Sequence, residues 1–298
     1  MAEWKGKTRG GAFGYRFFVL LIRKCGLRVA YTFLCIVLIH FIPFAPKATH
    51  STWIYARRIL KRSWIGAFFT IIRSYYMLGQ ILIDKIAIGN GMQSEFSFKF
   101  DHYQEFLDIL NANTGAVIIG AHVGNWEIGA PFFDDYGKKM NIVLYDAEYQ
   151  KIKKILEQNT AAAHYKIIPV NRDNLSHVFS ITAALNAKEY VCFQGDRFLN
   201  EEKRLEATFM EHKAYFPLGP FLLASRLNVP VVFYFAMREP GRTYRFHFTI
   251  AKPIVKERGK KAEQALLQQY LTALESVVKR YPTQWFNYYR FWHKSKAA

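Results

Sequence analysis

Residues 116–129 read Ala-Val-Ile-Ile-Gly-Ala-His-Val-Gly-Asn-Trp-Glu-Ile-Gly, and we expect the rest of the chain to be organised around them. The apolar run from Ala116 to Gly120 predicts a buried strand. His122 follows the strand directly, and Glu127 comes five positions later. A histidine beside a carboxylate is what a general base and its orienting partner require. If a helix begins soon after the histidine, Glu127 lies in its first turn and can reach back toward His122.

Both residues also have an ordinary structural interpretation. A histidine near a strand end is commonly a structural residue whose ring is satisfied by its neighbours. A glutamate in the first turn of a helix is favoured by the helix dipole. Short motifs carry a real risk of false positives, so the pair needs support from the rest of the chain.

Composition and charge narrow the class of protein. The chain has 298 residues, 51% hydrophobic and 17% aromatic, enough for one large α/β domain or two small ones and too apolar for disorder. Its three cysteines show no metal-ligand spacing, which favours reduced thiols in a cytoplasm-like compartment. The net charge is +18, and residues 1–100 hold 15 Lys and Arg against 3 Asp and Glu. Nucleic acid, an acidic protein or an anionic membrane could meet such a surface, and its many apolar residues favour the membrane over nucleic acid.

The first third of the chain is therefore predicted to be a membrane anchor. Residues 13–28 mix basic and large apolar side chains, as an interfacial helix does, although an amphipathic helix on a globular core is the alternative. Residues 29–46 carry no charge, but 18 residues are near the lower limit for a spanning helix, and Pro43 and Pro46 shorten it. Basic residues flank both ends, so we favour a monotopic or re-entrant anchor over a single span. We assign residues 1–92 to a membrane-associating helical region and 93–298 to a catalytic domain.

Strands and helices then alternate, which predicts an α/β fold with a mostly parallel, helix-covered sheet. We expect strands over 96–100, 116–120, 141–145, 166–170, 189–193, 229–236 and 245–250, the last at an edge because its pattern alternates. We expect helices over 101–112, 147–164, 175–186, 217–228 and 260–280. Sites in such sheets form at the carboxyl ends of strands. The His122 loop and the run Gln194-Gly195-Asp196-Arg197 both lie at such ends.

The second loop and the region after it offer substrate contacts. Asp196 and Arg197 could form a structural ion pair, or Arg197 could bind a phosphate. Residues 213–220, beginning at Lys213, could line an acyl channel or open a helix. The sequence has no P-loop, no Gly-x-Gly-x-x-Gly, no Cys/His metal set and no Gly-x-Ser-x-Gly, so we expect no cofactor, no metal and no covalent nucleophile. Direct attack of a hydroxyl or amine on a thioester, with His122 as base, needs none of these motifs.

The stretch His122-Val-Gly-Asn-Trp-Glu127 resembles the His-x4-Asp/Glu block of the lysophospholipid acyltransferase superfamily, and more closely the lauroyl/myristoyl acyltransferases of lipid A biosynthesis. The resemblance extends over most of the chain, through the apolar N-terminal region, Phe193-Gln-Gly-Asp-Arg197, the run around Phe216-Pro217, and Tyr281-Pro-Thr-Gln-Trp285. It implies a glycerol-3-phosphate acyltransferase-like fold, and an enzyme at the cytoplasmic face of the bacterial inner membrane. The implied donor is acyl-acyl carrier protein or, less often, acyl-CoA.

The same resemblance makes His122 and Glu127 the catalytic dyad and Asp196 with Arg197 a substrate-binding pair. We further predict that Asn125 and Lys213 contact substrate. Val123 replaces the usual aromatic residue, and Gln-Gly-Asp-Arg replaces the commoner Asp-Gln-Asp, which leaves the acceptor open. It could be a lipid A precursor, an amino-acid lipid, a pigment, another glycolipid or a lysophospholipid. A hydrolase and a non-catalytic basic membrane-binding protein are the alternatives.

Overall fold

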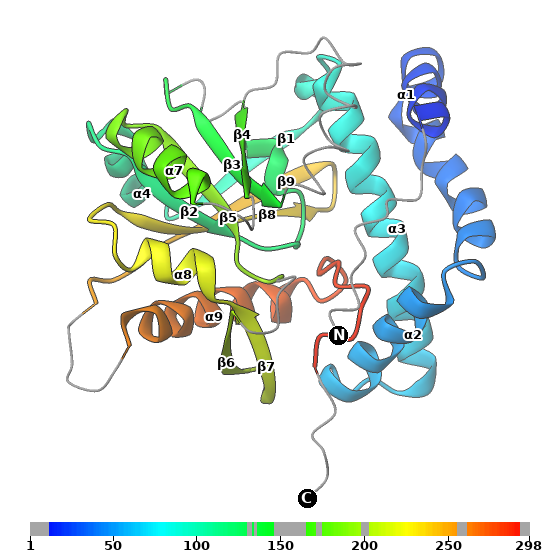
Figure 1. The fold of residues 1–298 in the computed structure, drawn as a ribbon. Coiled ribbons are helices and arrows are strands. Elements are labelled where there is room, and N and C mark those ends of the chain that lie inside the picture. The colour runs from blue at the N-terminus through cyan, green and yellow to red at the C-terminus, as the bar shows by residue number, and fades with distance from the viewer. Residues whose placement is uncertain are drawn as a thin grey trace, which may run out of the picture.

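The computed structural model of the protein describes residues 12–129, 133, 136–145, 165–170, 175–197, 203–254 and 261–292. Within them a seven-stranded sheet is covered by helices on both faces, which confirms the predicted α/β class. The N-terminal helices, which lie within residues 12–89, stand along one side of the sheet (Figure 1). The helix expected over residues 147–164 lies outside the described residues.

The sheet is parallel over five of its seven strands. Its order is β1 (Ser97–Asp101), β9 (Thr243–Ile250), β8 (Val231–Glu239), β2 (Ala116–Gly120), β5 (Tyr190–Gln194), β3 (Met140–Tyr145) and β4 (Tyr165–Val170). The β8–β9 pair is antiparallel, so β9 and its parallel neighbour β1 run against the other five. The prediction that residues 245–250 form an edge strand is wrong, because β1 lies outside β9. The alternation in β9 instead follows its burial, with Phe246 and Phe248 buried and His247 between them partly exposed.

Each face of the sheet has its own hydrophobic core. One core joins α1 (Ala12–Phe41), α3 (Trp64–Gly89) and α4 (Tyr103–Asn111) to the sheet. The other joins α7 (Ser176–Asn186), α8 (Leu218–Ala224) and α9 (Ala262–Arg280) to the opposite face. Because both faces are covered, β2 and nearly all of β8 are buried, as continuous apolar strands of parallel sheets are.

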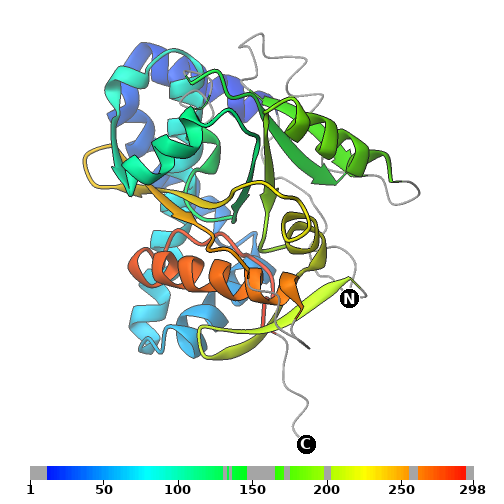
Figure 2. The ribbon, with the colours of Figure 1, turned by 90° about the vertical axis from the view of Figure 1, so that its left-hand side faces the viewer.

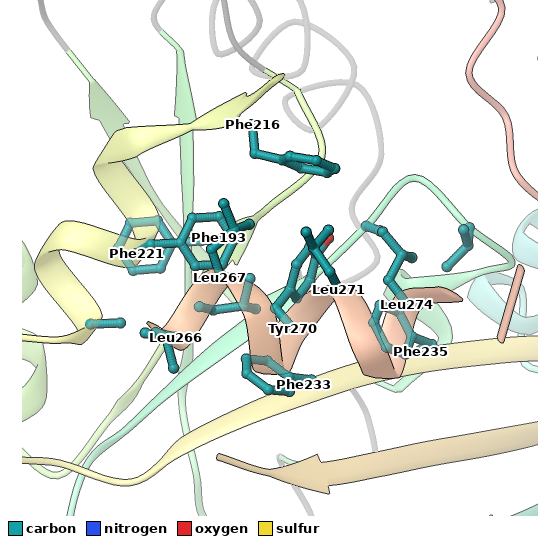
Figure 3. Packing of buried hydrophobic residues seen from close by; sticks show 14 of the residues in the cluster. Phe193, Phe216, Phe221, Phe233, Phe235, Leu266, Leu267, Tyr270, Leu271 and Leu274 are labelled. Atoms are coloured by element: carbon teal, nitrogen blue, oxygen red, sulfur yellow. The ribbon is translucent and has the colours of Figure 1, made fainter. Parts of the chain in front are cut away.

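Helix α9 shows how sequence spacing builds the second core. Its buried positions recur three to four residues apart, which places them along one stripe of the helix. Figure 3 shows Leu267, Tyr270 and Leu274 of this stripe packed beside Phe233 and Phe235 of β8. The hydroxyl of the fully buried Tyr270 donates to the carbonyl of Gly120, 2.9 Å away, at the end of β2. The helix therefore supports the strand end from which the His122 loop begins.

A two-stranded hairpin that the sequence did not predict lies beside α9 (Figure 2). It consists of β6 (Arg204–Phe209) and β7 (His212–Pro217). The two loop residues, Met210 and Glu211, have φ of 51° and 66°. Such a turn is usually built from Asn and Gly, so its sequence gives little warning of a hairpin. Residues 213–220 form the second strand of this hairpin and the start of α8.

The N-terminal helices share the core of the sheet. Helix α1 bends at Gly26, whose φ is 81°, and residues 29–46 form its second half and the turn into α2 (Pro46–Ile54). A short π-helix (Tyr55–Ile59) leads toward α3. Among the described residues, α3 is the one helix long and apolar enough to cross a membrane, with 39% of its most apolar window buried. Core helices of soluble proteins can be equally long and apolar, and Ile71, Tyr75 and Ile83 of α3 lie in the core beside the sheet.

Candidate active site

Two neighbouring strand ends bring His122 and Asp196 together. Strands β2 and β5 are parallel neighbours, and Gly120 pairs with Gln194 at their carboxyl ends. His122 and Asp196 each lie two residues beyond these paired ends. Nδ1 of His122 lies 2.7 Å from one carboxylate oxygen of Asp196, and the backbone N–H of His122 donates to the other oxygen at 3.0 Å. Both oxygens of one carboxylate thus contact one histidine.

Asp196 is fully buried, and three more contacts define its surroundings. The indole N–H of Trp285 donates to Asp196 at 3.4 Å, and the hydroxyl of Tyr289 donates to its backbone carbonyl, also at 3.4 Å. The backbone N–H of Gly195 donates to the carbonyl of Gly120 at 2.8 Å, which carries the β2–β5 pairing one step past the sheet. A side chain at position 195 would lie 2.8 Å from Ile119 and Tyr270, so this close approach requires glycine.

The surroundings of His122 favour the neutral form of its ring. Burial lowers the pKa of His122 and Arg197 lowers it further, against the opposing effect of Asp196. Burial raises the pKa of Asp196, but the adjacent His122 and Arg197 outweigh burial and hold it below its ordinary value. About a quarter of the His122 side chain is exposed. With Nδ1 directed at a carboxylate, Nε2 is the nitrogen that can accept a proton from a substrate.

Glu127 lies away from the His122 ring. It belongs to a short 3-10 helix (Trp126–Gly129) and forms an ion pair with Lys85 of α3. Both residues are described, and no hydrogen bond joins Glu127 to His122. The start of this turn is attached to β8, because the backbone N–H of Asn125 donates to the carbonyl of Ala236 at 2.8 Å. The expected contact between His122 and Glu127 is therefore absent here, and Asp196 occupies the Nδ1 position.

Asn125 is a buried residue of the His122 loop. Only 4% of the residue is exposed, and its side-chain nitrogen lies 3.5 Å from the hydroxyl of Tyr244. That hydroxyl donates to Asp84 of α3 at 2.6 Å, and Arg238 of β8 donates to the same carboxylate oxygen at 2.7 Å. A buried polar network therefore connects the His122 loop with the N-terminal helices.

Arg197 and Lys213 have different surroundings. The guanidinium of Arg197 donates to the carbonyl of Phe286 at 2.8 Å and to the side-chain oxygen of Asn287 at 3.2 Å. Arg197 is near enough to His122 to lower the pKa of the ring. Lys213 lies on the hairpin, 72% exposed, and pairs with Glu206 at 2.6 Å. The structure thus gathers His122, Asp196 and Arg197 into one cluster, and it records no contact of Lys213 with these three described residues.

The C-terminal tail frames the site, which the sequence did not predict. Residues 284–286 run antiparallel to the His122 loop, with Val123 bridged to Trp285. The N–H of Phe286 donates to the carbonyl of His122, and the N–H of Gly124 donates to the carbonyl of Gln284, both at 2.9 Å. In Figure 1 this tail passes between α9 and α3. The sequence shows that the tail is aromatic, but it does not show that the tail pairs with the His122 loop.

Comparison with known proteins connects this arrangement to a family. Residues 71–294 match the family model described as bacterial lipid A biosynthesis acyltransferase. The match includes the whole sheet, the His122 loop, Asp196 and the C-terminal tail. A search of curated protein sequences returns no significant match.

Proposed function

Because the chain belongs to the bacterial lipid A biosynthesis acyltransferase family, we propose that it moves a fatty acyl chain from an acyl thioester to a hydroxyl or amine of a lipid, with His122 as general base. The acceptor we propose is a lipid A precursor. The observation that supports this proposal most directly is the His122 ring, which is partly exposed and has Nδ1 on a buried carboxylate. That arrangement leaves Nε2 as the proton acceptor.

The proposed reaction needs no covalent enzyme intermediate. Nε2 of His122 removes the proton of the acceptor hydroxyl or amine while its oxygen or nitrogen attacks the thioester carbonyl. The carbon–sulfur bond breaks, the thiolate leaves, and the imidazolium returns the proton to the sulfur. The products are the acylated lipid and a free thiol. General base catalysis of this kind contributes about 10²–10⁴-fold.

Arg197 is the substrate contact with the clearest chemical support. A guanidinium binds phosphate oxygens through several donors, and this one lies close to His122. Asn287, which holds Arg197, has a buried side-chain nitrogen with no hydrogen-bond acceptor among the described residues. An oxygen-rich substrate group would supply one. Asn125 and Lys213 remain predicted substrate contacts, and Lys213 on its exposed hairpin is the one placed to meet a soluble donor protein.

The surface chemistry supports a proposal for the donor and for the location of the enzyme. The net charge of +18 favours an acidic carrier protein over a small thioester as the donor. Most of the large apolar side chains that are exposed in the described residues belong to α1, α3 and the turn before α2. A basic surface with exposed Ile, Phe and Trp is suited to an anionic bilayer. We propose that the enzyme works at the cytoplasmic face of the inner membrane.

Two substitutions test the proposal. His122→Ala and Glu127→Ala are expected to abolish acyl transfer while the proteins remain folded and bound to membranes. The assay combines an acyl-acyl carrier protein with a lipid acceptor and follows the acylated lipid by mass spectrometry. Free fatty acid released without an acceptor would identify a hydrolase instead. Full transfer activity in both variants would rule out the proposed site.

Comparing the lipids of cells with and without the active gene identifies the acceptor. We expect a mass difference of one acyl chain on a lipid A species. The same difference on another lipid would keep the reaction and change the acceptor.

A further inference from the structure

We propose that Asp196 is the positioning residue that orients His122, so that the working pair joins two neighbouring strands instead of two positions of one loop. The inference rests on the proposed function, because it assigns a partner to the proposed base. It gives Asp196 a different task from the substrate binding that the sequence predicted. It also separates the tasks of Asp196 and Glu127.

The geometry of the contact fixes the ring in one state. One oxygen of Asp196 accepts from the backbone N–H of His122 at 3.0 Å, and the other lies 2.7 Å from Nδ1. A carboxylate can only accept, so Nδ1 must carry the proton and Nε2 must be unprotonated. Because both contacts come from one carboxylate, the ring cannot rotate without losing one of them. This is the tautomer that a general base needs.

The two carboxylates differ in how firmly they are held. Asp196 is fully buried and also accepts from Trp285. The Glu127 side chain is 24% exposed and already paired with Lys85. For Glu127 to orient His122, it would first have to leave Lys85. Asp196 meets the requirement without any movement.

The contact strengthens during the reaction. When Nε2 accepts the proton of the substrate, His122 becomes an imidazolium next to a buried carboxylate. Electrostatic attraction is large in such a poorly solvated place, and it exists only after the charge has formed. Interactions that appear only in the transition state accelerate the chemical step. Asp196 is therefore expected to raise kcat with little effect on KM.

Asp196→Asn is the informative substitution, because an amide cannot satisfy both contacts. If its oxygen accepts from the backbone N–H of His122, its NH₂ group faces Nδ1, and the ring must carry its proton on Nε2. If its oxygen faces Nδ1, its NH₂ group meets the backbone N–H. The first orientation gives the wrong tautomer, and the second places two donors together. The corresponding change in Ser-His-Asp hydrolases lowers kcat by about 10⁴-fold.

The experiment measures kcat and kcat/KM against pH for wild type, Asp196→Asn, Glu127→Gln for comparison, His122→Ala, and Asp196→Asn combined with His122→Ala. Circular dichroism and thermal unfolding verify that each variant is folded. Asp196→Asn is expected to lose about 10²–10⁴-fold in kcat and to shift the acid limb of kcat/KM to lower pH. Glu127→Gln is expected to lower the rate, because Glu127 belongs to the proposed site, but to leave the acid limb of its remaining activity in place. The double variant is expected to be no slower than His122→Ala alone, because Asp196 acts through the ring.

The outcomes separate this inference from the proposed function. An inactive His122→Ala together with a fully active Asp196→Asn of unchanged pH profile would overturn the role of Asp196 and keep the reaction. A shift of the limb in Glu127→Gln but not in Asp196→Asn would assign the orienting role to Glu127. Full activity of His122→Ala would overturn the proposed base itself.

One measurement on the unaltered protein needs no variant to fold. Nitrogen-15 NMR of histidine-labelled protein at pH 7 reports which ring nitrogen carries the proton. We expect the His122 signals to show protonated Nδ1 and unprotonated Nε2, and a proton on Nε2 would overturn the inference.

Discussion

The ring of His122 predicts how the activity depends on pH. Its pKa lies below the ordinary value of 6.5, first because the ring is buried and then because Arg197 is near. A general base works only when it is unprotonated, so kcat/KM should stay constant on the acid side of neutrality. It should fall only as the pH drops through the lowered pKa of His122. A pH profile of acyl transfer at low substrate concentration measures this limb, and a midpoint above 6.5 would contradict the assignment.

A side chain at position 124 is expected to destabilise the protein for a steric reason. The φ of Gly124 is 55°, and a side chain there would lie 2.0 Å from the carbonyl oxygen of Ala236. Gly137 has a similar φ of 66° but open space around it, so it is a matched control. Gly137→Ala should cost about 1–2 kcal/mol of unfolding free energy for the left-handed backbone alone. Gly124→Ala should cost about 1–3 kcal/mol more for the overlap, as chemical denaturation would show. Equal losses would contradict the close approach.

The sequence favours Glu127 over Asp196 as the partner of His122 for a physical reason. The pattern correctly placed His122 and Asp196 at the carboxyl ends of buried strands. It could not tell which strands are neighbours, and β5 lies beside β2 although β3 and β4 come between them in the chain. Closeness in sequence then favours Glu127. The turn that carries it points the carboxylate at Lys85, a residue 42 positions earlier, and no local pattern encodes that contact.

The exposed face of α3 predicts how the enzyme meets a bilayer. Ile65, Phe68 and Phe69 are 50–64% exposed near the start of the helix. Replacing all three with Ser should lower partition into anionic vesicles at least tenfold, because each large apolar side chain gains about 1 kcal/mol or more on burial in lipid. The unfolding midpoint should change little. Phe179→Ser on α7, at 76% exposure, is the control and should leave vesicle binding unchanged. Equal binding by the triple variant would exclude this face as the contact.

Element positions were predictable where the burial pattern was simple. Strands β2, β3, β4 and β5 and helix α9 lie within two residues of their predicted bounds. A strand buried on both faces is apolar throughout, and a helix buried on one face carries one apolar stripe, so both patterns can be recognised in the sequence. The hairpin of β6 and β7 was missed because Met210 and Glu211 adopt a turn that usually needs Gly or Asn. The absence of charge in residues 29–46 led to the prediction of an anchor there. Among the described helices, α3 is instead the one long and apolar enough to cross a membrane, although it contains Arg73, Asp84 and Lys85.

At the scale of the molecule, the C-terminal tail connects the helical side with the candidate active site. Tyr288 stacks on Tyr75 of α3 with ring centroids 5.0 Å apart, and Trp285 donates to Asp196. Gln284 forms two hydrogen bonds with the backbone of Arg238, at 2.6 and 2.9 Å. The C-terminal tail therefore contacts both the N-terminal helices and the His122 loop.

The buried pair of Asp84 and Arg238 is the clearest test of that connection. Asp84 is fully buried and accepts from Arg238 of β8 and from Tyr244 of β9, so it joins α3 to the sheet. Asp84→Asn leaves the buried guanidinium without its counter-charge, and the cost should be about 3–5 kcal/mol of unfolding free energy. The matched control is Glu211→Gln, which removes an exposed ion pair with Lys61, 2.8 Å between the charged atoms, and should cost far less because solvent screens it. Chemical denaturation measures both, and equal losses would show that α3 is held to the sheet by apolar packing alone.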